Sequence, residues 1–225
     1  MHAAPILPWN QIDTVLLDMD GTLLDLYFDW HFWWEYLPAQ YAKAHNLPLA
    51  VAQQQVREAI SAEQGTLNWY CTDYWSARLN LPVAALKRDL QHMIRPHPQV
   101  EAFLSRLRQL GKILYLVTNA HRDSLNLKLE VTAIGRFFDA IISAHDYGLP
   151  KEDARIWAAI RAEHEYNPQR TLLIDDNLRA LESAQAYGIR HLLAASHVSP
   201  HMPPVETDRF PTFSHFSQIM PDNTP

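Results

Sequence analysis

The chain has 225 residues, a formal net charge of −6 and a hydrophobic content of 48%. At about 150 residues per domain, this length allows one large domain or a core with an insertion, and the apolar fraction excludes disorder over most of the chain. The absence of long basic runs argues against a nucleic acid polymer as partner, and no apolar run approaches the roughly 18 residues of a membrane span. Residues 1–11 lack a signal-peptide pattern, and the single cysteine, Cys71, excludes an internal disulfide, so we expect a cytoplasmic protein.

Five short apolar runs alternate with helical patterns along the chain. Near-continuous apolarity is typical of strands that are covered on both faces. Strands that alternate with helices predict an α/β fold, a doubly wound, parallel, five-stranded sheet of the Rossmann-like type, with its sites at the carboxyl ends of the strands. The predicted strands are Thr14–Asp18, Lys112–Thr118, Ala140–Ser143, Thr171–Asp175 and His191–Ala194, and the helices between them lie near 100–110, 151–164 and 178–187.

One long segment interrupts this alternation. From about residue 25 to residue 94 the sequence shows helical patterns, at 39–45, 49–63 and 70–79, and no convincing strand. Pro96 and Pro98 then force extended backbone. We therefore predict a catalytic core made of residues 1–24 and 95–225 and an inserted, all-helical cap made of residues 25–94. The tail after Ser196 is expected to be irregular up to a short helix near residues 214–220.

Polar residues follow four of the predicted strands. Taken singly, each is as consistent with a solvated loop or a helix cap as with a site. Several carboxylates that converge on one sheet edge repel each other unless a cation lies among them, so the set as a whole predicts a metal and anion site. A glycine-rich phosphate loop is excluded, because no two glycines lie closer than Gly135 and Gly148. The residues are Asp18, Asp20, Thr118, Asn119, Lys151, Asp175 and Asp176.

The motifs DMDGT, VTN, GLPK and LLIDD, in this order and each after a predicted strand, resemble the four motifs of the haloacid dehalogenase-like hydrolase superfamily. They span nearly the whole chain outside the insertion. The insertion point, just after the first motif, resembles the position of that superfamily's helical cap. The sequence departs from the common pattern in two places. The fourth motif is Asp-Asp rather than Gly-Asp followed later by another Asp, and the second motif uses Thr118 rather than serine.

The resemblance implies a role for each catalytic residue. Asp18 would attack phosphorus and form an aspartyl-phosphate, and Asp20 would protonate the leaving alkoxide and then activate the hydrolytic water. Thr118 and the backbone N–H of Asn119 would bind the phosphoryl oxygens, and Lys151 would offset the negative charge. Dehalogenase members lack an acid at the position of Asp20, so a carbon–halogen substrate is not expected.

The resemblance also implies Mg²⁺ as the cofactor. Asp18, the backbone carbonyl of Asp20 and Asp176 would hold it, with water and substrate phosphate in the remaining positions. Asp175 is either a further ligand through water or an orienting group, and Asp176 is preferred because it aligns with the aspartate of the Gly-Asp form. Oxygen ligands fit a hard cation, and no spaced Cys/His set predicts zinc.

The insertion holds the clues to the substrate. Its aromatic residues either stack on a planar base or build the core of the cap, and composition alone favours packing. The segments DTVLLDMDGTLLDLYFDWHFW, TLNWYCTDYW and YGLPKEDARIW further resemble the bacterial purine 5′-nucleotidases that act on GMP and IMP, which implies a purine nucleoside monophosphate as small-molecule substrate. Candidate base or ribose contacts are Asn68, Asp73, His31, Asp25 and Asp29, and the five tryptophans are Trp30, Trp33, Trp34, Trp69 and Trp75.

The sequence also allows two other functions. A sugar-phosphate phosphatase or a phosphoglucomutase would use the same core with a polar sugar site. A binding module that has lost catalysis is disfavoured, because the acids and Lys151 are all present.

Cys71 is predicted to be a small buried hydrophobe. Glu152 and Asp153 are predicted to be a solvated helix start, where Lys151 is unfavourable unless an anion faces it.

Overall fold

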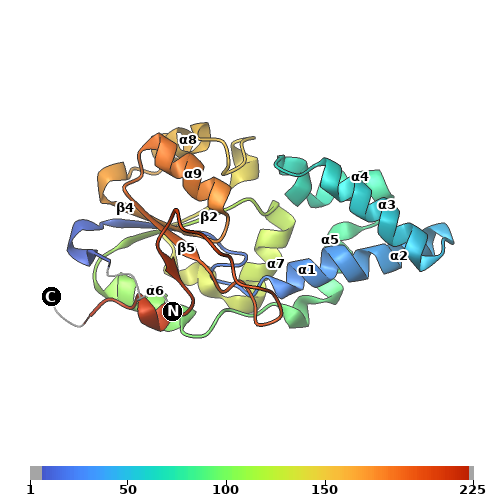
Figure 1. Cartoon of the computed structure of the whole chain (residues 1–225), viewed down its shortest axis with the longest axis horizontal. Coiled ribbons are helices and arrows are strands. Elements are labelled where there is room, and N and C mark those ends of the chain that lie inside the picture. Colours follow the sequence, from blue (N-terminus) through green and yellow to red (C-terminus); the bar gives the residue numbers. More distant parts are fainter. Residues whose placement is uncertain (1–6, 223–225) are drawn as a thin grey trace.

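A computed structural model describes residues 7–222. Residues 1–6 and 223–225, which belong to the predicted core, lie outside the described residues. Residues 1–6 are also part of the segment that lacks a signal-peptide pattern. Figure 1 shows a sheet flanked by helices, with a bundle of further helices extending to one side of it. Within residues 7–222, no helix combines the length and the apolarity that crossing a membrane would require.

The sheet is parallel throughout and has the strand order β3-β2-β1-β4-β5-β6. The predicted class is confirmed, and so are the positions of the five predicted strands. The prediction of five strands was wrong by one, because a two-residue strand in the tail pairs with Ala194 and Ala195 and is too short to produce a sequence pattern. The strands are β1 (Thr14–Leu17), β2 (Ile113–Thr118), β3 (Ala140–Ser143), β4 (Thr171–Asp175), β5 (His191–Ala195) and β6 (Thr212–Phe213).

Helices cover both faces of the sheet, as the apolar strands require. Helices α6 (Val100–Gln109) and α7 (Arg122–Thr132) pack on one face, and α8 (Arg155–Glu163) and α9 (Leu178–Tyr187) pack on the other (Figure 1). Successive strand residues point to opposite faces, so Leu17 packs with the first pair of helices and Leu16 with the second.

Helix α8 begins four residues later than predicted. The Asp153 carboxylate accepts a hydrogen bond from the Arg155 backbone N–H at 3.0 Å, and the helix starts there. Lys151 therefore lies in a turn before the helix, and the prediction that it opens the helix was wrong. Its charge must be explained by the groups that it contacts and not by the helix dipole.

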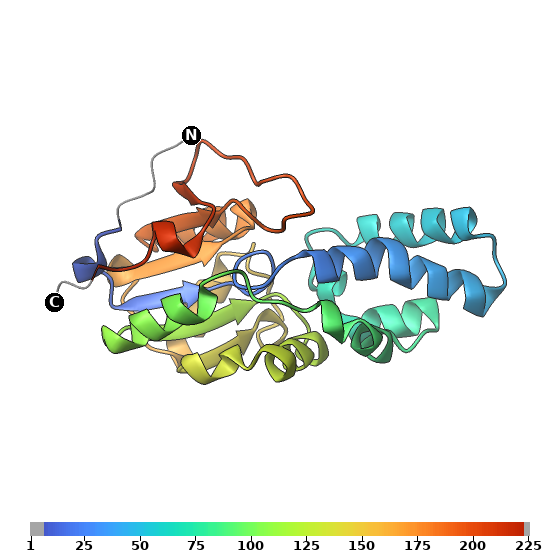
Figure 2. The same cartoon turned by 90° about the horizontal axis from the view of Figure 1, so that it is seen from below.

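The segment between β1 and α6 is helical, as predicted, and its aromatic first stretch forms helix as well. Figure 2 shows these helices grouped on one side of the sheet. Trp75, Val56 and Ile60 of this segment belong to the same continuous hydrophobic cluster as Leu17 of the sheet, so the division into separate domains at residues 25 and 94 stays a prediction. The helices are α1 (Tyr27–His31), a π-helical turn (Phe32–Tyr36), α2 (Leu37–His45), α3 (Leu49–Ala62), α4 (Thr72–Leu79) and α5 (Val83–Asp89).

Short 3₁₀ turns complete the chain. They connect the longer elements, and the last of them lies inside the region where a tail helix was predicted. The turns are Trp9–Gln11, Leu67–Tyr70, Gln91–Met93, Ile134–Phe137, Ala144–Asp146, Pro168–Arg170 and Phe216–Gln218.

The two connections between the sheet and the helical segment run side by side. The Asp25 N–H donates to the Arg95 carbonyl and the His97 N–H donates to the Leu23 carbonyl, both at 2.9 Å. An isolated antiparallel bridge pairs Leu24 with Pro96 between these two bonds. The helical segment is thus joined to the sheet directly beside the first motif.

Candidate active site

Three acidic side chains gather where β1 and β4 end. Asp18 follows β1 directly, Asp175 is the last residue of β4, and Asp176 comes next. Because β1 and β4 are parallel neighbours, their carboxyl ends meet at one sheet edge. One carboxylate oxygen from each residue lies within 4.8 Å of those from the other two. The structure therefore brings together three of the four acids that the sequence singled out, at what we call the catalytic edge, while Asp20 pairs with Lys128 beside it.

Lys151 provides the positive charge at the catalytic edge. Its buried ammonium donates to Asp18 Oδ1 and, at 2.7 Å, to Asp175 Oδ2. The other Asp175 oxygen accepts the Asn177 N–H at 2.9 Å, so both Asp175 oxygens are engaged. In contrast, Asp18 Oδ2 is buried and has no hydrogen-bond partner among residues 7–222. Asp18 and Asp176 are therefore better placed than Asp175 to ligate a cation.

The electrostatics of the catalytic edge also point to a cation. Burial raises the pKa of Asp18 to about 6, with the Asp175 charge adding to the effect and Lys151 opposing it. Burial and the charges of Asp18 and Asp175 raise the pKa of Asp176 well above its ordinary range. A hard divalent cation would remove this repulsion, because it provides the positive charge that these oxygens lack. The acidic group fits a metal ion with oxygen ligands.

Gly21 of the first motif lets Asp176 come close. Its φ of 81° lies in the left-handed region, and a Cβ built on it would stand 2.5 Å from Asp176 Oδ2. Any other residue would push this carboxylate away from Asp18.

The second and third motifs are joined by a side-chain network. The Asn119 side chain accepts the Lys151 N–H at 2.9 Å and donates to Glu152 Oε2 at 2.9 Å. Glu152 Oε1 accepts from Asn177 at 2.7 Å and from the Tyr70 hydroxyl of the helical segment at 3.3 Å. Glu152 is thus a connecting residue, and its prediction as part of a solvated helix start was wrong because its partners come from distant segments. Thr118 is buried beside this network.

A chain of buried ion pairs leads from the catalytic edge into the helical segment. Lys128 of α7 contacts Asp20 Oδ1 at 2.7 Å and Asp29 Oδ2 at 2.6 Å, and Lys87 of α5 contacts Asp29 Oδ1 at 2.6 Å. The two lysine side chains are only 1% and 3% exposed. Sequence reasoning missed both of them, although each interrupts the apolar face of its helix.

These ion pairs shift the two carboxylates in opposite directions. Burial raises the pKa of Asp20 to about 6, with Asp29 and Asp18 adding to it and Lys128 opposing it. For Asp29, Lys128 and Lys87 together outweigh burial and hold the pKa at about 2. Asp20 is therefore the carboxyl that can exchange a proton near neutral pH, and Asp29 stays ionised.

A cavity of about 250 Å³ opens beside these ion pairs. Its polar wall is formed by Asp20, Asp29, Lys87 and Lys128, and its aromatic wall comes from the helical segment. Trp75 is fully buried instead and packs in the hydrophobic core. Some aromatic residues of the insertion therefore build the core, as predicted, and others line a cavity, while stacking on a base stays a prediction. The aromatic wall comprises Trp30, Trp33, Trp34, Trp69 and Tyr70.

Of the five candidate base or ribose contacts, only Asp29 lines the cavity. Asp25 accepts the Tyr27 N–H at 2.9 Å and caps a turn. Asn68 donates to Glu63 at the surface. The other two are His31, which pairs with Glu35 at 2.6 Å, and Asp73, whose side chain is 77% exposed.

The haloacid dehalogenase-like hydrolase family matches residues 12–188, and the chain belongs to this family of hydrolases. Over 215 residues the chain is 36% identical to the GMP/IMP nucleotidase YrfG of Escherichia coli (strain K12), which covers 96% of this chain and 97% of that protein.

More distant similarities also extend over most of the chain. The chain is 23% identical over 187 residues to the pyrophosphatase PpaX of Bacillus velezensis, with 80% of this chain and 82% of that protein covered. The crystal structure of a HAD phosphatase from Thermococcus onnurineus superposes with a TM-score of 0.79 at 17% identity, covering 92% of this chain and 96% of that one. This last similarity shows the shared fold.

Proposed function

We propose that the chain is a Mg²⁺-dependent phosphomonoester hydrolase of the cytoplasm, a 5′-nucleotidase that dephosphorylates purine nucleoside monophosphates such as GMP and IMP. The observation that carries this proposal is the position of Asp20. It forms part of the cavity wall, while Asp18, two residues earlier, belongs to the catalytic edge. A phosphate at the edge would therefore leave the rest of the substrate inside the aromatic cavity. The similarity to a GMP/IMP nucleotidase over nearly the whole chain supports the same substrate class.

The two first-motif acids divide the chemistry between them. Asp18 attacks phosphorus through one carboxylate oxygen and forms an aspartyl-phosphate, while the bond to the nucleoside 5′-oxygen breaks and that oxygen takes a proton from Asp20. Asp20 then removes a proton from water, which cleaves the aspartyl-phosphate and releases phosphate. A pKa of about 6 suits a group that first donates and then accepts a proton.

The remaining residues of the catalytic edge handle charge. Lys151 holds the second Asp18 oxygen and offsets the charge of the phosphoryl group, and Thr118 with the Asn119 N–H binds phosphoryl oxygens. Asp18, Asp176 and the Asp20 carbonyl would hold Mg²⁺, which when bound neutralises the negative charge that these groups share with the phosphate.

The cavity favours a planar base over a sugar. Tryptophan faces stack on a purine ring, and base–aromatic stacking is worth about 1–3 kcal/mol per base. Four half-buried tryptophans line this cavity, Trp30, Trp33, Trp34 and Trp69. The charged groups of its polar wall, Asp29 and Lys87, are suited to hydroxyl groups of the ribose.

The test is phosphate release from GMP, IMP, AMP, CMP, glucose 6-phosphate and glucose 1-phosphate, each with Mg²⁺ and with EDTA. We expect Mg²⁺-dependent release that is fastest for GMP and IMP and absent in Asp18→Asn. Faster release from a sugar phosphate would retain the phosphatase chemistry and overturn the substrate assignment. Release that survives in Asp18→Asn would overturn the mechanism.

A further inference from the structure

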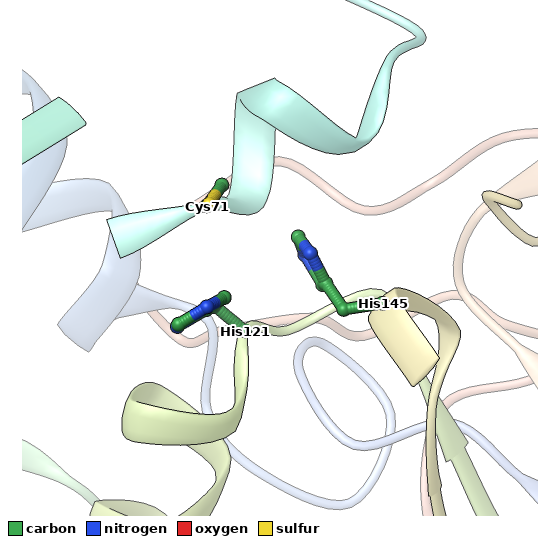
Figure 3. A group of neighbouring side chains, drawn as sticks. All are labelled: Cys71, His121 and His145. Atoms are coloured by element: carbon green, nitrogen blue, oxygen red, sulfur yellow. The ribbon is translucent and has the colours of Figure 1, made fainter. Parts of the chain in front are cut away.

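A second group of metal-ligating side chains lies where the helical segment meets the core. Cys71 directly precedes α4, His121 directly precedes α7, and His145 belongs to the 3₁₀ turn after β3 (Figure 3). The cysteine sulfur and one ring nitrogen of each histidine lie within 4.8 Å of one another. The catalytic proposal uses none of these three residues. We propose that Cys71, His121 and His145 bind a transition-metal ion of the zinc type, which joins the helical segment to the core.

The donor set selects this class of metal. A thiolate and two imidazoles are typical ligands of Zn²⁺ and of chemically similar ions, and they are poor ligands for Mg²⁺. Zinc bonds of about 2.3 Å to sulfur and 2.0–2.1 Å to nitrogen place tetrahedral ligand atoms roughly 3.5 Å apart. Side-chain movements of roughly 1 Å therefore close the site. The fourth position remains for water or for Asp73, whose Oδ2 lies 3.6 Å from His121 Nε2.

His145 has a nitrogen in the form that a metal requires. Its Nε2 is buried and has no hydrogen-bond partner among residues 7–222. In the neutral tautomer with its hydrogen on Nδ1, this Nε2 offers its electron pair to a metal ion. Burial, with His121 adding to the effect, lowers the pKa of His145 and favours the neutral ring. An unpaired, buried nitrogen costs free energy, and a bound metal ion would remove this cost.

His121 is oriented in the way that metal-binding histidines usually are. Its Nδ1 lies 2.7 Å from the Thr72 hydroxyl, which donates its own hydrogen to Asp123 Oδ2 at 3.2 Å. With the Thr72 hydrogen on Asp123, Nδ1 donates the first bond and Nε2 keeps a free electron pair. Fixing one ring nitrogen through such an outer partner is common around metal sites. Cys71 is oriented too, because its sulfur accepts the Tyr74 N–H at 3.4 Å.

The location gives the site a consequence for turnover, which rests on the proposed function. Cys71 belongs to the helical segment, and His121 lies three residues after Thr118 of the second motif. Metal binding would release the thiol proton to solvent and hold the helical segment against the core. Exchange of substrate and product through the cavity would then slow, so we expect Zn²⁺ to inhibit phosphate release.

The direct test does not depend on activity. Co²⁺ is titrated into the full chain in excess Mg²⁺, and the thiolate-to-cobalt charge-transfer absorption is recorded. Cys71 is the single cysteine, so only this site can produce that absorption. We expect saturation at one equivalent, loss of the band in Cys71→Ser, and at least about tenfold weaker Co²⁺ binding in His121→Gln and in His145→Gln. His92→Gln, which changes an exposed histidine, is the matched control and should bind normally.

Absence of the charge-transfer band in the wild type would overturn the proposal. An unchanged affinity for Co²⁺ in both histidine variants would also overturn the proposal, since the thiol alone would then bind the ion. Circular dichroism and thermal unfolding without Co²⁺ identify any variant that fails to fold. The remaining ligand variants then show whether their side chains bind Co²⁺. For the inhibition, Zn²⁺ should slow the wild type and spare Cys71→Ser, and equal slowing of both would overturn the link to turnover.

Discussion

The catalytic edge and the polar wall of the cavity are both buried and charged, but their charges balance differently. At the edge, three carboxylates face the single ammonium of Lys151. At the wall, two carboxylates face two ammonium groups, those of Lys87 and Lys128. The pKa values follow the contrast at one wall residue: the two lysines hold the pKa of Asp29 at about 2, whereas burial raises the pKa values of Asp18 at the edge and of Asp20 at the wall to about 6.

This difference separates chemistry from positioning. A buried carboxylate without a counter-charge is costly, so we expect the edge to be complete only with a cation. The wall is neutral as it stands and fixes Asp20 relative to α5 and α7.

Asp18→Asn should abolish phosphate release, because it removes the nucleophile and a metal ligand together. The same change relieves repulsion with Asp175 and Asp176, so the unfolding temperature in EDTA should stay equal or rise. Phosphate release and thermal unfolding measure the two effects. Asp208→Asn, at an exposed position of the tail, is the control and should change neither. A large loss of stability in Asp18→Asn would contradict the electrostatic description of the edge.

Asp20→Asn should lower kcat for GMP by about 10²–10⁴-fold, the usual contribution of general acid–base catalysis. The loss in kcat/KM, which reports the first half-reaction, should be smaller for p-nitrophenyl phosphate than for GMP, because its leaving group departs without a proton. Steady-state kinetics on both substrates measure the difference. Equal losses for the two leaving groups would remove Asp20 from the role of general acid.

Lys87→Met tests the balanced wall. Asp29 would keep Lys128 and lose one charged hydrogen bond, so the free energy of unfolding should fall by about 1–3 kcal/mol. Arg88→Met is the matched control, because its pair with Glu130 is exposed on both sides and should contribute less than about 1 kcal/mol. Urea unfolding compares the two variants. Equal losses would mean that the buried chain of ion pairs is no stronger than a surface pair.

Trp69→Ala should raise KM for GMP by roughly 5- to 30-fold, which corresponds to stacking worth about 1–2 kcal/mol. KM for p-nitrophenyl phosphate should change far less. Trp75→Phe, in the buried core, should lower stability and leave the ratio of the two KM values unchanged. If Trp69→Ala raises both KM values alike, Trp69 packs against its neighbours and does not stack on the base.

The sequence predicted the catalytic edge well because its residues are marked locally. Apolar runs identify β1 and β4, and each acid follows a run directly, so the parallel sheet brings them together without further information. Lys151 was selected for a reason that proved wrong, since α8 begins after it. Its partners, Asp18 and Asp175, explain its charge instead.

The polar wall and the Cys71 group were missed because their partners are far apart in the chain. Lys87 could have been recognised from the sequence, because it lies four residues after Val83 and three before Leu90, on an apolar helix face. Both of these neighbours are buried. Lys128 interrupts the face of α7 in the same way, three residues after Leu125. Cys71 and His121 are 50 residues apart and show no ligand spacing, so only the folded chain brings them together.

The paired connections at Leu23–Asp25 and Arg95–His97 have a bearing on how such enzymes diversify. The helical segment leaves and rejoins the sheet at points held together by two backbone hydrogen bonds, which depend on no particular side chain. An insert of another size or composition can be joined at these same points without changing the strand order. The reaction and the choice of substrate can therefore be inherited separately, and recombination at this junction offers a direct way to transplant one specificity onto another catalytic core.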